Sequence, residues 1–257
     1  PLKRLQKGVE KIKNGDFHSK VKIITNDSFG VLADTFNEMS SSIEEKTQKI
    51  YQIQNSIITG MATMVESRDN STGGHIKRTS ECVKLFISEI KKNDEFKNLA
   101  DYFCADVIKA APMHDLGKIA VDDSILRKPG KFTDEEYEKM KKHSEEGVKI
   151  IENVLSEVDD NNFKTIAINI AHYHHEKYNG QGYPDKLKGA EIPLEARIMA
   201  LADVFDALVS KRCYKDTFSY DKAFSIIQES LGSHFDPKLG KIFIDSREKF
   251  EMLYSRI

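Results

Sequence analysis

A narrow apolar stripe recurs over residues 29–64 at alternating steps of three and four residues, broken only at Lys46 and Gly60. On a helix this spacing places the apolar side chains along one seam, as in a coiled coil. So narrow a seam cannot bury itself within one chain, and we expect it to pair in a parallel homodimer. An ordinary amphipathic helix that packs on the same chain is the alternative. The stripe consists of Phe29, Leu32, Phe36, Met39, Ile43, Ile50, Ile53, Ile57 and Met64.

A shorter seam with the same spacing precedes this stripe in residues 2–12 and ends at Asn14-Gly15. A polar connector then leads into the long helix. The diagnostic residues around these segments are Pro1, Gly15-Asp16, Asn26-Asp27-Ser28-Phe29-Gly30 and Phe36-Asn37-Glu38-Met39. Over residues 1–48 this order resembles the HAMP family of signal relays, with Ser28 where that family usually has Glu.

The resemblance to HAMP relays implies a place within a larger signalling protein. In that family the relay follows a transmembrane helix and feeds an output domain. The chain begins at Pro1, without an initiator Met and directly in a helical pattern. We therefore expect an upstream transmembrane sensor outside this chain, and we expect the chain to be the cytoplasmic portion of a bacterial inner-membrane protein.

Composition excludes several classes of partner and site. Lys+Arg 39 against Asp+Glu 41 gives a net charge of −2, so no basic field suits a nucleic acid polymer. The three cysteines are far apart and lack C-x-x-C spacing, which argues against a disulfide framework or a zinc ribbon. No apolar run approaches the roughly 18 residues of a membrane span.

From Val65 onward the pattern is helical almost throughout and no convincing strand pair occurs, so an all-α fold is predicted. The one long irregular stretch, Glu176 to Ile192, directly follows a histidine pair, and loops of that length are usually functional. The expected helices lie near 76–91, 99–115, 134–156, 162–175, 193–211, 219–231 and 237–248.

The histidines carry the clearest chemical signal. The chain has only eight, yet five of them fall at the ends of expected helices or in a Gly-rich turn. Imidazole mixed with carboxylate suits iron, manganese or zinc, whereas an all-oxygen site would suit magnesium or calcium. A His-Asp pair alone is equally typical of a hydrogen-bonded helix end, so the whole set decides. The set is His75, His114-Asp115, His143, His174-His175 and Asp203.

Further motifs accompany this set in order. They are Arg68-Asp69, Gly117-Lys118, Lys128-Pro129-Gly130, His174-His175-Glu176 followed by Gly182-Tyr183-Pro184, and Arg212-x-Tyr214-Lys215. Together they resemble the HD-GYP family of cyclic di-GMP phosphodiesterases over about residues 60–247. The expected fold is therefore all-α, with a HAMP-type parallel coiled coil joined by a long helix to a helical HD-type metallohydrolase bundle. The expected boundaries are 1–48 for the HAMP-like relay, 49–65 for the connecting coiled-coil helix and 66–257 for the HD-GYP phosphodiesterase domain.

The resemblance also implies the ligands of two divalent ions, most simply iron or manganese. His114, Asp115 and Asp203 would hold one ion. The ligands of the other would be His143, His174 and His175, with Asp115 bridging and His75 completing the cluster. Members with a third metal have Glu four residues before the first histidine, and Ser71 stands there, so two ions are expected.

A metal pair about 4 Å apart can activate a water and hold both the attacked phosphate and the leaving oxygen. Asp115 and Lys118 are the expected catalytic residues, because Lys118 follows one turn later and would neutralise charge on the phosphate. The expected reaction is hydrolysis of cyclic di-GMP to linear pGpG and/or GMP. The phosphates of cyclic di-GMP need cationic side chains, and its guanines need planar side chains to stack on. The expected substrate-binding residues are Lys118, Tyr183, Arg212, Tyr214 and Lys215; His18, His172 and His234 are expected to be structural.

Two alternatives stay open. In the first, the chain would be a catalytically silent cyclic di-GMP receptor. In the second, it would be an HD phosphohydrolase for another nucleotide such as cyclic GMP-AMP. Every expected ligand is present, which favours hydrolysis, and the intact Gly-Tyr-Pro loop argues against an unrelated nucleotide. The family's usual proline after the HD pair is replaced by Asp122, which removes no ligand. The sequence gives neither the signal sensed nor the direction of regulation.

Overall fold

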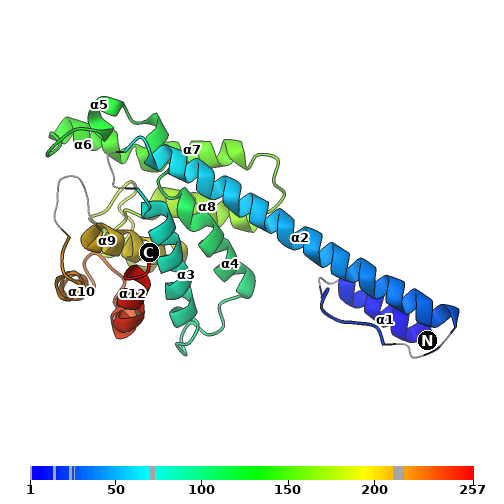
Figure 1. Cartoon of the computed structure of the whole chain (residues 1–257). Helices are drawn as coiled ribbons and strands as arrows, with labels where there is room; N and C mark the ends of the chain where they lie inside the picture. The colour runs from blue at the N-terminus through cyan, green and yellow to red at the C-terminus, as the bar shows by residue number, and fades with distance from the viewer. Residues whose placement is uncertain (1, 14–15, 23–24, 26, 70–72, 211–216) are drawn as a thin grey trace. The chain divides into compact units, whose positions relative to one another are not determined.

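A computed structural model describes residues 2–13, 16–22, 25, 27–69, 73–210 and 217–257 (Figure 1). The chain divides into two compact units, Pro1–Ile57 and Ile58–Ile257, and helix α2 (Ser28–Glu66) runs through the boundary between them. The described residues contain helices and only two isolated β-bridges, so the all-α prediction is confirmed. None of the described helices combines the length and the apolarity that crossing a bilayer requires.

The first unit is built on α1 (Leu2–Lys13) and the first part of α2. A small core of Val21, Ala33 and Phe36 lies between them. Gly8 allows this packing, since a Cβ there would lie 2.2 Å from Cγ2 of Val21. The side chain of Asn37 accepts from the N–H of Val21 at 2.8 Å and donates to its carbonyl at 3.0 Å. The connector is thereby fixed against α2.

Most of the predicted seam on α2 stays uncovered in the single chain. Phe36 enters the small core, but most other positions of the seam are 41–65% exposed. The expected pairing with a second copy stays a prediction. The exposed positions are Phe29, Leu32, Met39, Ile50, Ile53, Ile57 and Met64.

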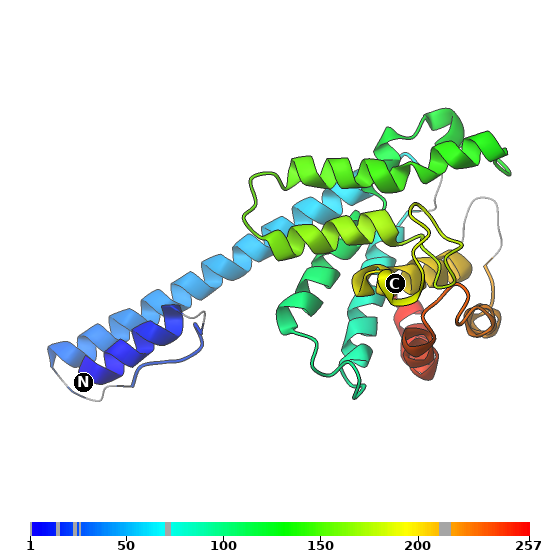
Figure 2. The ribbon, with the colours of Figure 1, turned by 180° about the vertical axis from the view of Figure 1, so that it is seen from behind.

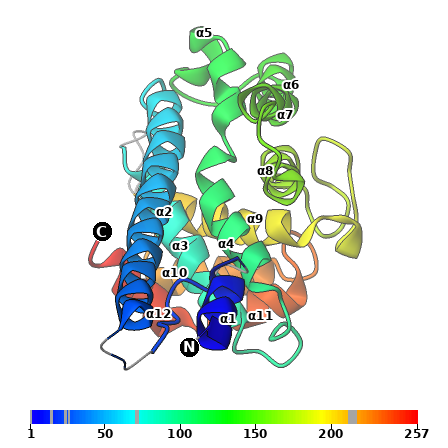
Figure 3. The ribbon, with the colours of Figure 1, turned by 90° about the vertical axis from the view of Figure 1, so that its right-hand side faces the viewer.

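The second unit is a bundle of helices around one core. In it α7 (His143–Val154) and α8 (Asn161–Tyr173) lie side by side, and Figure 3 views them nearly end-on (Figure 2, Figure 3). Short 3-10 turns η1 (Ala111–Met113), η2 (Leu116–Ala120) and η3 (Gly189–Glu191) interrupt the helices. The helices are α3 (His75–Ile90), α4 (Asp101–Ala110), α5 (Asp123–Leu126), α6 (Asp134–Lys141), α7 (His143–Val154), α8 (Asn161–Tyr173), α9 (Leu194–Val209), α10 (Tyr220–Glu229), α11 (Pro237–Asp245) and α12 (Arg247–Tyr254).

Two expected helices are divided in the structure. The stretch 134–156 breaks at Lys142, whose N–H bonds to Lys139 three residues back, and the stretch 237–248 breaks at Ser246. The expected helix 99–115 ends at Ala110, because Pro112 has no N–H to continue the α-helical pattern. The break at Lys142 directly precedes His143, and the end of α4 at Ala110 shortly precedes His114.

Aromatic rings fill the centre of the second unit. The ring of Phe243 lies 5.0 Å from that of Phe86, 5.2 Å from that of Phe205 and 4.0 Å from that of Phe250. The end of α2 belongs to the same core, because Ala62 is 2% and Val65 is 6% exposed within it. The last turns of α2 are thus part of this unit, while the expected domain boundary at residue 66 stays a prediction.

Candidate metal centre

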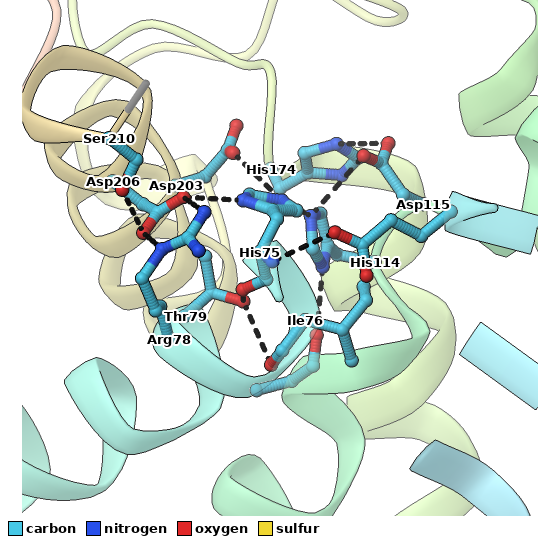
Figure 4. Close-up of polar contacts among 12 residues, drawn as sticks. His75, Ile76, Arg78, Thr79, His114, Asp115, His174, Asp203, Asp206 and Ser210 are labelled. Carbon is cyan, nitrogen blue, oxygen red and sulfur yellow. Dashed lines mark hydrogen bonds and ion pairs between the residues drawn. The ribbon is translucent and has the colours of Figure 1, made fainter. Parts of the chain in front are cut away.

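The structure brings all seven expected ligands together from five places in the chain. The ligand candidates form two groups, each with ligand atoms within 4.8 Å of one another. Figure 4 shows His75, His114, Asp115, His174 and Asp203 of these groups. His114 lies with His75 and Asp203, whereas Asp115 faces the remaining histidines. The first group is His75, His114 and Asp203; the second is Asp115, His143, His174 and His175.

The carboxylate of Asp115 lies between the two groups. Its Oδ1 is 3.5 Å from Nε2 of His143 and 3.8 Å from Nε2 of His174. Its Oδ2 is 3.4 Å from Nε2 of His114, which belongs to the other group. One oxygen therefore faces each group, as a bridging ligand requires.

Backbone carbonyls orient the histidine rings. Nδ1 of His114 lies 2.9 Å from the carbonyl of Ala111, and Nδ1 of His143 lies 2.7 Å from that of Met140. His174 uses the carbonyl of Ile170 at 2.9 Å in the same way. A carbonyl accepts only from an N–H, so in each neutral ring Nδ1 carries the proton and the Nε2 lone pair is left for a metal.

Several of the atoms that could bind a metal at this site are buried without a hydrogen-bond partner among the described residues. They include Oδ1 of Asp115 and Nε2 of both His143 and His174. Leaving a buried polar atom without a partner costs roughly 1–3 kcal/mol of folding stability. A cation in contact with these atoms would remove that cost. The mixed nitrogen and oxygen donors suit a borderline divalent metal. The residues present therefore fit a divalent metal.

The charge states also suit ligation. Burial lowers the pKa of His174 to about 3 and holds the pKa of His175 well below its usual range, so both rings are neutral at pH 7. Burial opposes ionisation of Asp115, but Lys118 and His114 outweigh it and hold its pKa well below the usual range. Neutral imidazole and ionised carboxylate are the forms that bind metal.

These shifts predict that the metal-free protein loses stability in mild acid. The pKa of His174 is lowered in the fold, from 6.5 to about 3, so only the unfolded chain takes up its proton in between. The resulting stability is present above pH 6.5 and is lost as the pH falls towards 3, at about 1.4 kcal/mol per pH unit for each such group. His143 and His175 act in the same sense. Burial opposes the charged form of His114, but Asp115 raises its pKa, so it partly offsets the loss.

Thermal unfolding of the chelator-treated protein, followed by circular dichroism from pH 7.5 to pH 5, measures this effect. We expect the midpoint to fall steadily below pH 6.5. A matched control is His18→Gln, since the side chain of His18 is 86% exposed and pairs with Glu44. It should leave the slope unchanged. A midpoint that is flat over this range would contradict the prediction.

An ion-pair network holds His75 from behind. Asp206 is 1% exposed and lies 2.8 Å from Nδ1 of His75. The same carboxylate accepts from Nε of Arg78 at 2.7 Å and from the hydroxyl of Ser210 at 3.0 Å (Figure 4). Burial opposes ionisation of Asp206, but His75 and Arg78 lower its pKa to about 2. No role was predicted for Asp206 from the sequence, although Asp206 follows Asp203 by about one helical turn.

Lys118 lies inside the site, in ion pairs. Its ammonium is 2.8 Å from Oδ2 of Asp115 and 3.3 Å from Oδ2 of Asp69. Burial opposes the charged form, but Asp115 and Asp69 raise the pKa of the Lys118 ammonium, so it stays charged. Its expected contact with a phosphate stays a prediction.

Tyr183 packs on a metal-ligand candidate. Its ring centroid lies 4.8 Å from that of His175, with 31° between the planes. The loop reaches this place because Gly182 touches the backbone, and a Cβ there would lie 2.3 Å from the nitrogen of Lys177. The other expected substrate-binding residues, Arg212, Tyr214 and Lys215, and also Ser71, lie outside the described residues.

A cavity of about 610 Å³ opens beside both groups. His234, which was expected to be structural, lies in the lining of this cavity. The N–H of Tyr178 donates to the carbonyl of His234 at 3.0 Å, and this pairing brings the later turn to the site. His172 does not line the cavity and lies 3.4 Å from Asp185. The cavity is lined in part by Glu66, Asp69, His75, Asp115, Lys118, Lys128, Phe132, Tyr137, His143, His175, Lys177, Tyr183, Asp203 and His234.

Comparisons with known proteins identify the family of each part of the chain. A family model described as an HD domain matches residues 60–239, and one described as a HAMP domain matches residues 1–45. A cyclic di-GMP phosphodiesterase of Vibrio cholerae is 39% identical over 250 residues, which cover 97% of this chain and 51% of the relative. A 3′3′-cGAMP-specific phosphodiesterase of the same organism is 39% identical over 195 residues, which cover 76% of this chain and 35% of that protein. The chain thus spans about half or less of these relatives.

A solved structure supports the fold. The crystal structure of a cyclic GMP-AMP-specific phosphodiesterase from V. cholerae aligns with a TM-score of 0.50 and 18% sequence identity. The alignment covers 78% of this chain and 50% of the other. At this identity the likeness concerns the helical architecture alone.

Proposed function

Because this chain belongs to the HD domain family, with a HAMP domain ahead of the HD domain, we propose that it hydrolyses cyclic di-GMP in a metal-dependent reaction. The products would be linear pGpG and/or GMP. The observation that carries the proposal is the pair of His/Asp groups on either side of Asp115, beside one cavity. Such an arrangement suits hydrolysis of a phosphodiester.

The two groups support a site for two divalent ions, for which we propose iron or manganese. His75, His114 and Asp203 would hold one ion. The ligands of the other would be Asp115, His143, His174 and His175, with Asp115 shared. Bound divalent ions would supply Lewis acidity that polarises the phosphate and lowers the pKa of an attacking water.

The protein's own residues would position and neutralise the substrate. Lys118 is charged and lines the cavity next to Asp115, so it would stabilise the negative charge that develops on the phosphate. Tyr183 lines the same cavity and would contact a guanine with its ring face. Arg212 and Lys215 would contact the phosphates or guanine, and Tyr214 would assist them.

We favour cyclic di-GMP as the proposed substrate because the similarity to a cyclic di-GMP phosphodiesterase extends over 97% of this chain. Cyclic GMP-AMP is the second candidate, since a relative named for it is equally identical over a shorter stretch. A silent cyclic di-GMP receptor is the third candidate. The complete set of metal-binding groups favours hydrolysis over that receptor.

The decisive experiment measures metal and turnover on the same preparation. Anaerobically purified protein is analysed by mass spectrometry for metals and incubated separately with cyclic di-GMP and 3′3′-cyclic GMP-AMP. We expect about two equivalents of iron or manganese and faster loss of cyclic di-GMP. Faster loss of cyclic GMP-AMP would transfer the proposal to that substrate. Binding without turnover would identify a receptor, and neither binding nor turnover would refute the proposal.

Regulation would pass through the end of α2. The carboxylate of Glu66 accepts from the N–H of His75 at 2.8 Å. Just beyond, Asp69 pairs with Lys118, which in turn pairs with Asp115. A shift of α2 would therefore displace residues of both donor groups. The input would come from an upstream transmembrane sensor of a bacterial inner membrane.

The exposed seam of α2 leads us to propose a parallel homodimer. Ile53 is on the seam and 50% exposed, while Tyr51 is off the seam and 53% exposed. Ile53→Asp is expected to raise the dimer dissociation constant by at least about tenfold, because each copy would bury a charge in place of an apolar side chain. Tyr51→Asp is the matched control and should change it little. Sedimentation of the full chain measures both, and equal effects would count against pairing through the seam.

A further inference from the structure

Aromatic rings line the outer part of the cavity, beyond the metal-binding groups. Phe132 follows α5 in the chain, and Tyr137 lies in α6. Both line the cavity, and neither belongs to a buried hydrophobic core of the described residues. Phe132 is 36% and Tyr137 is 45% exposed, whereas the rings of the central phenylalanine cluster are fully buried. Core packing therefore does not explain these two rings.

The rings continue a series that begins at the metal-binding groups. The ring centroid of Tyr183 is 4.8 Å from that of His175. The ring of Tyr137 lies next, 6.4 Å from Tyr183 and nearly perpendicular to it at 81°. The ammonium of Lys141 is 4.7 Å from the centroid of Tyr137 and 5.7 Å from that of Tyr183. These contacts hold Tyr137 in place at the cavity.

A cation lies on the same side of the cavity. Lys128 lines it, and its ammonium pairs with Glu136, one residue before Tyr137 in α6. Ammonium groups are common partners of the O6 and N7 acceptors of guanine, and aromatic faces stack on any base. The outer cavity thus combines flat apolar surface with a donor, as a purine requires.

We infer that Tyr137 and Phe132 form the binding subsite for one purine base of a cyclic dinucleotide. The inference rests on the proposed function, because it assumes a phosphodiester next to Asp115. With the phosphate there, a base that extends along the cavity meets Tyr183 first and then Tyr137. Lys128 supplies the donor for the edge of the base.

The test compares three variants of the full chain with its metals bound. Tyr137→Ala is expected to raise KM for cyclic di-GMP about tenfold, through loss of base stacking, with kcat within about twofold of wild type. Tyr137→Phe keeps the ring and should restore KM. Tyr102→Ala is the matched control, because Tyr102 is 64% exposed on α4 and does not line the cavity.

Two further readouts separate base binding from a structural role. Metal content should be the same in all variants. With methyl 4-nitrophenyl phosphate, a diester without a nucleobase, kcat/KM of Tyr137→Ala should equal that of wild type. An unchanged KM for cyclic di-GMP would overturn the inference, and so would an equal loss with both substrates.

Failure of the proposed function gives a different result. If wild type turns over neither dinucleotide, calorimetric titration of the metal-loaded protein with cyclic di-GMP replaces the kinetic assay. A dissociation constant about tenfold higher in Tyr137→Ala, restored in Tyr137→Phe, would then support the subsite without hydrolysis. Equal dissociation constants, or no binding by wild type, would overturn it.

Discussion

Replacing Asp115 by alanine is expected to lower cyclic di-GMP turnover by a factor on the order of 10³ or more. One carboxylate oxygen faces His143 at 3.5 Å and the other faces His114 at 3.4 Å, so the substitution removes the one side chain that the two groups share. It also leaves Lys118 with Asp69 as its remaining carboxylate partner at hydrogen-bonding distance among the described residues. Metal content measured on the same preparation should fall below that of wild type.

The control for this variant is Asp94→Ala. The side chain of Asp94 is 96% exposed and pairs with Lys97 on the surface. It should keep wild-type turnover and metal content. Wild-type turnover by Asp115→Ala at full metal loading would show that Asp115 is not shared between two catalytic ions, and the two-ion assignment would then be wrong.

Gly117→Ala is expected to damage the same site through the backbone. A Cβ at Gly117 would lie 1.8 Å from the carbonyl oxygen of His143 and 2.5 Å from the nitrogen of Gly147. These are backbone atoms of α7 that cannot rotate away, so α7 must move from η2 and take His143 with it. Such overpacking typically costs about 1–3 kcal/mol, which lowers the melting temperature by about 2–12 °C in a domain of this size.

The signature of this variant is a combined loss of metal and of thermal stability. Differential scanning calorimetry and metal analysis measure the two effects. Gly60→Ala is the control, since a Cβ at Gly60 in α2 would meet no described atom within 4 Å apart from the adjacent backbone of its own helix. Alanine is the better helix former, so this control should melt at the wild-type temperature or above it. A Gly117→Ala protein with wild-type metal content would contradict the close approach of η2 and α7.

The sequence predicted what depends on short-range spacing. The three- and four-residue steps predicted the long helix of α2, and the expected helix 134–156 begins where α6 begins, after the capping box of Thr133 and Glu136. The seven ligand candidates were identified by their order along the chain, and the structure brings them together in two groups. Their roles as ligands stay predictions.

Long-range contacts could not be predicted in this way. His234 reaches the cavity because its carbonyl accepts from Tyr178, 56 residues earlier, and no local pattern marks that pairing. Arg78 and Asp206 come from α3 and α9, and they meet only when these helices pack. The break at Lys142 was missed because no proline marks it within residues 134–156, so a single helix was expected.

The shared use of α2 sets a rule for building chimeric sensors from this protein. Ala62 and Val65 lie in the core of the second unit, and Glu66 holds the N–H of His75. A foreign input domain must therefore be joined before Ile58, so that these contacts are kept. The junction must also keep the residue count along the helix, because one inserted residue turns everything upstream by about 100° relative to the site. A series of one-residue insertions at this point would thus change the orientation of the input domain relative to the site in steps of about 100°.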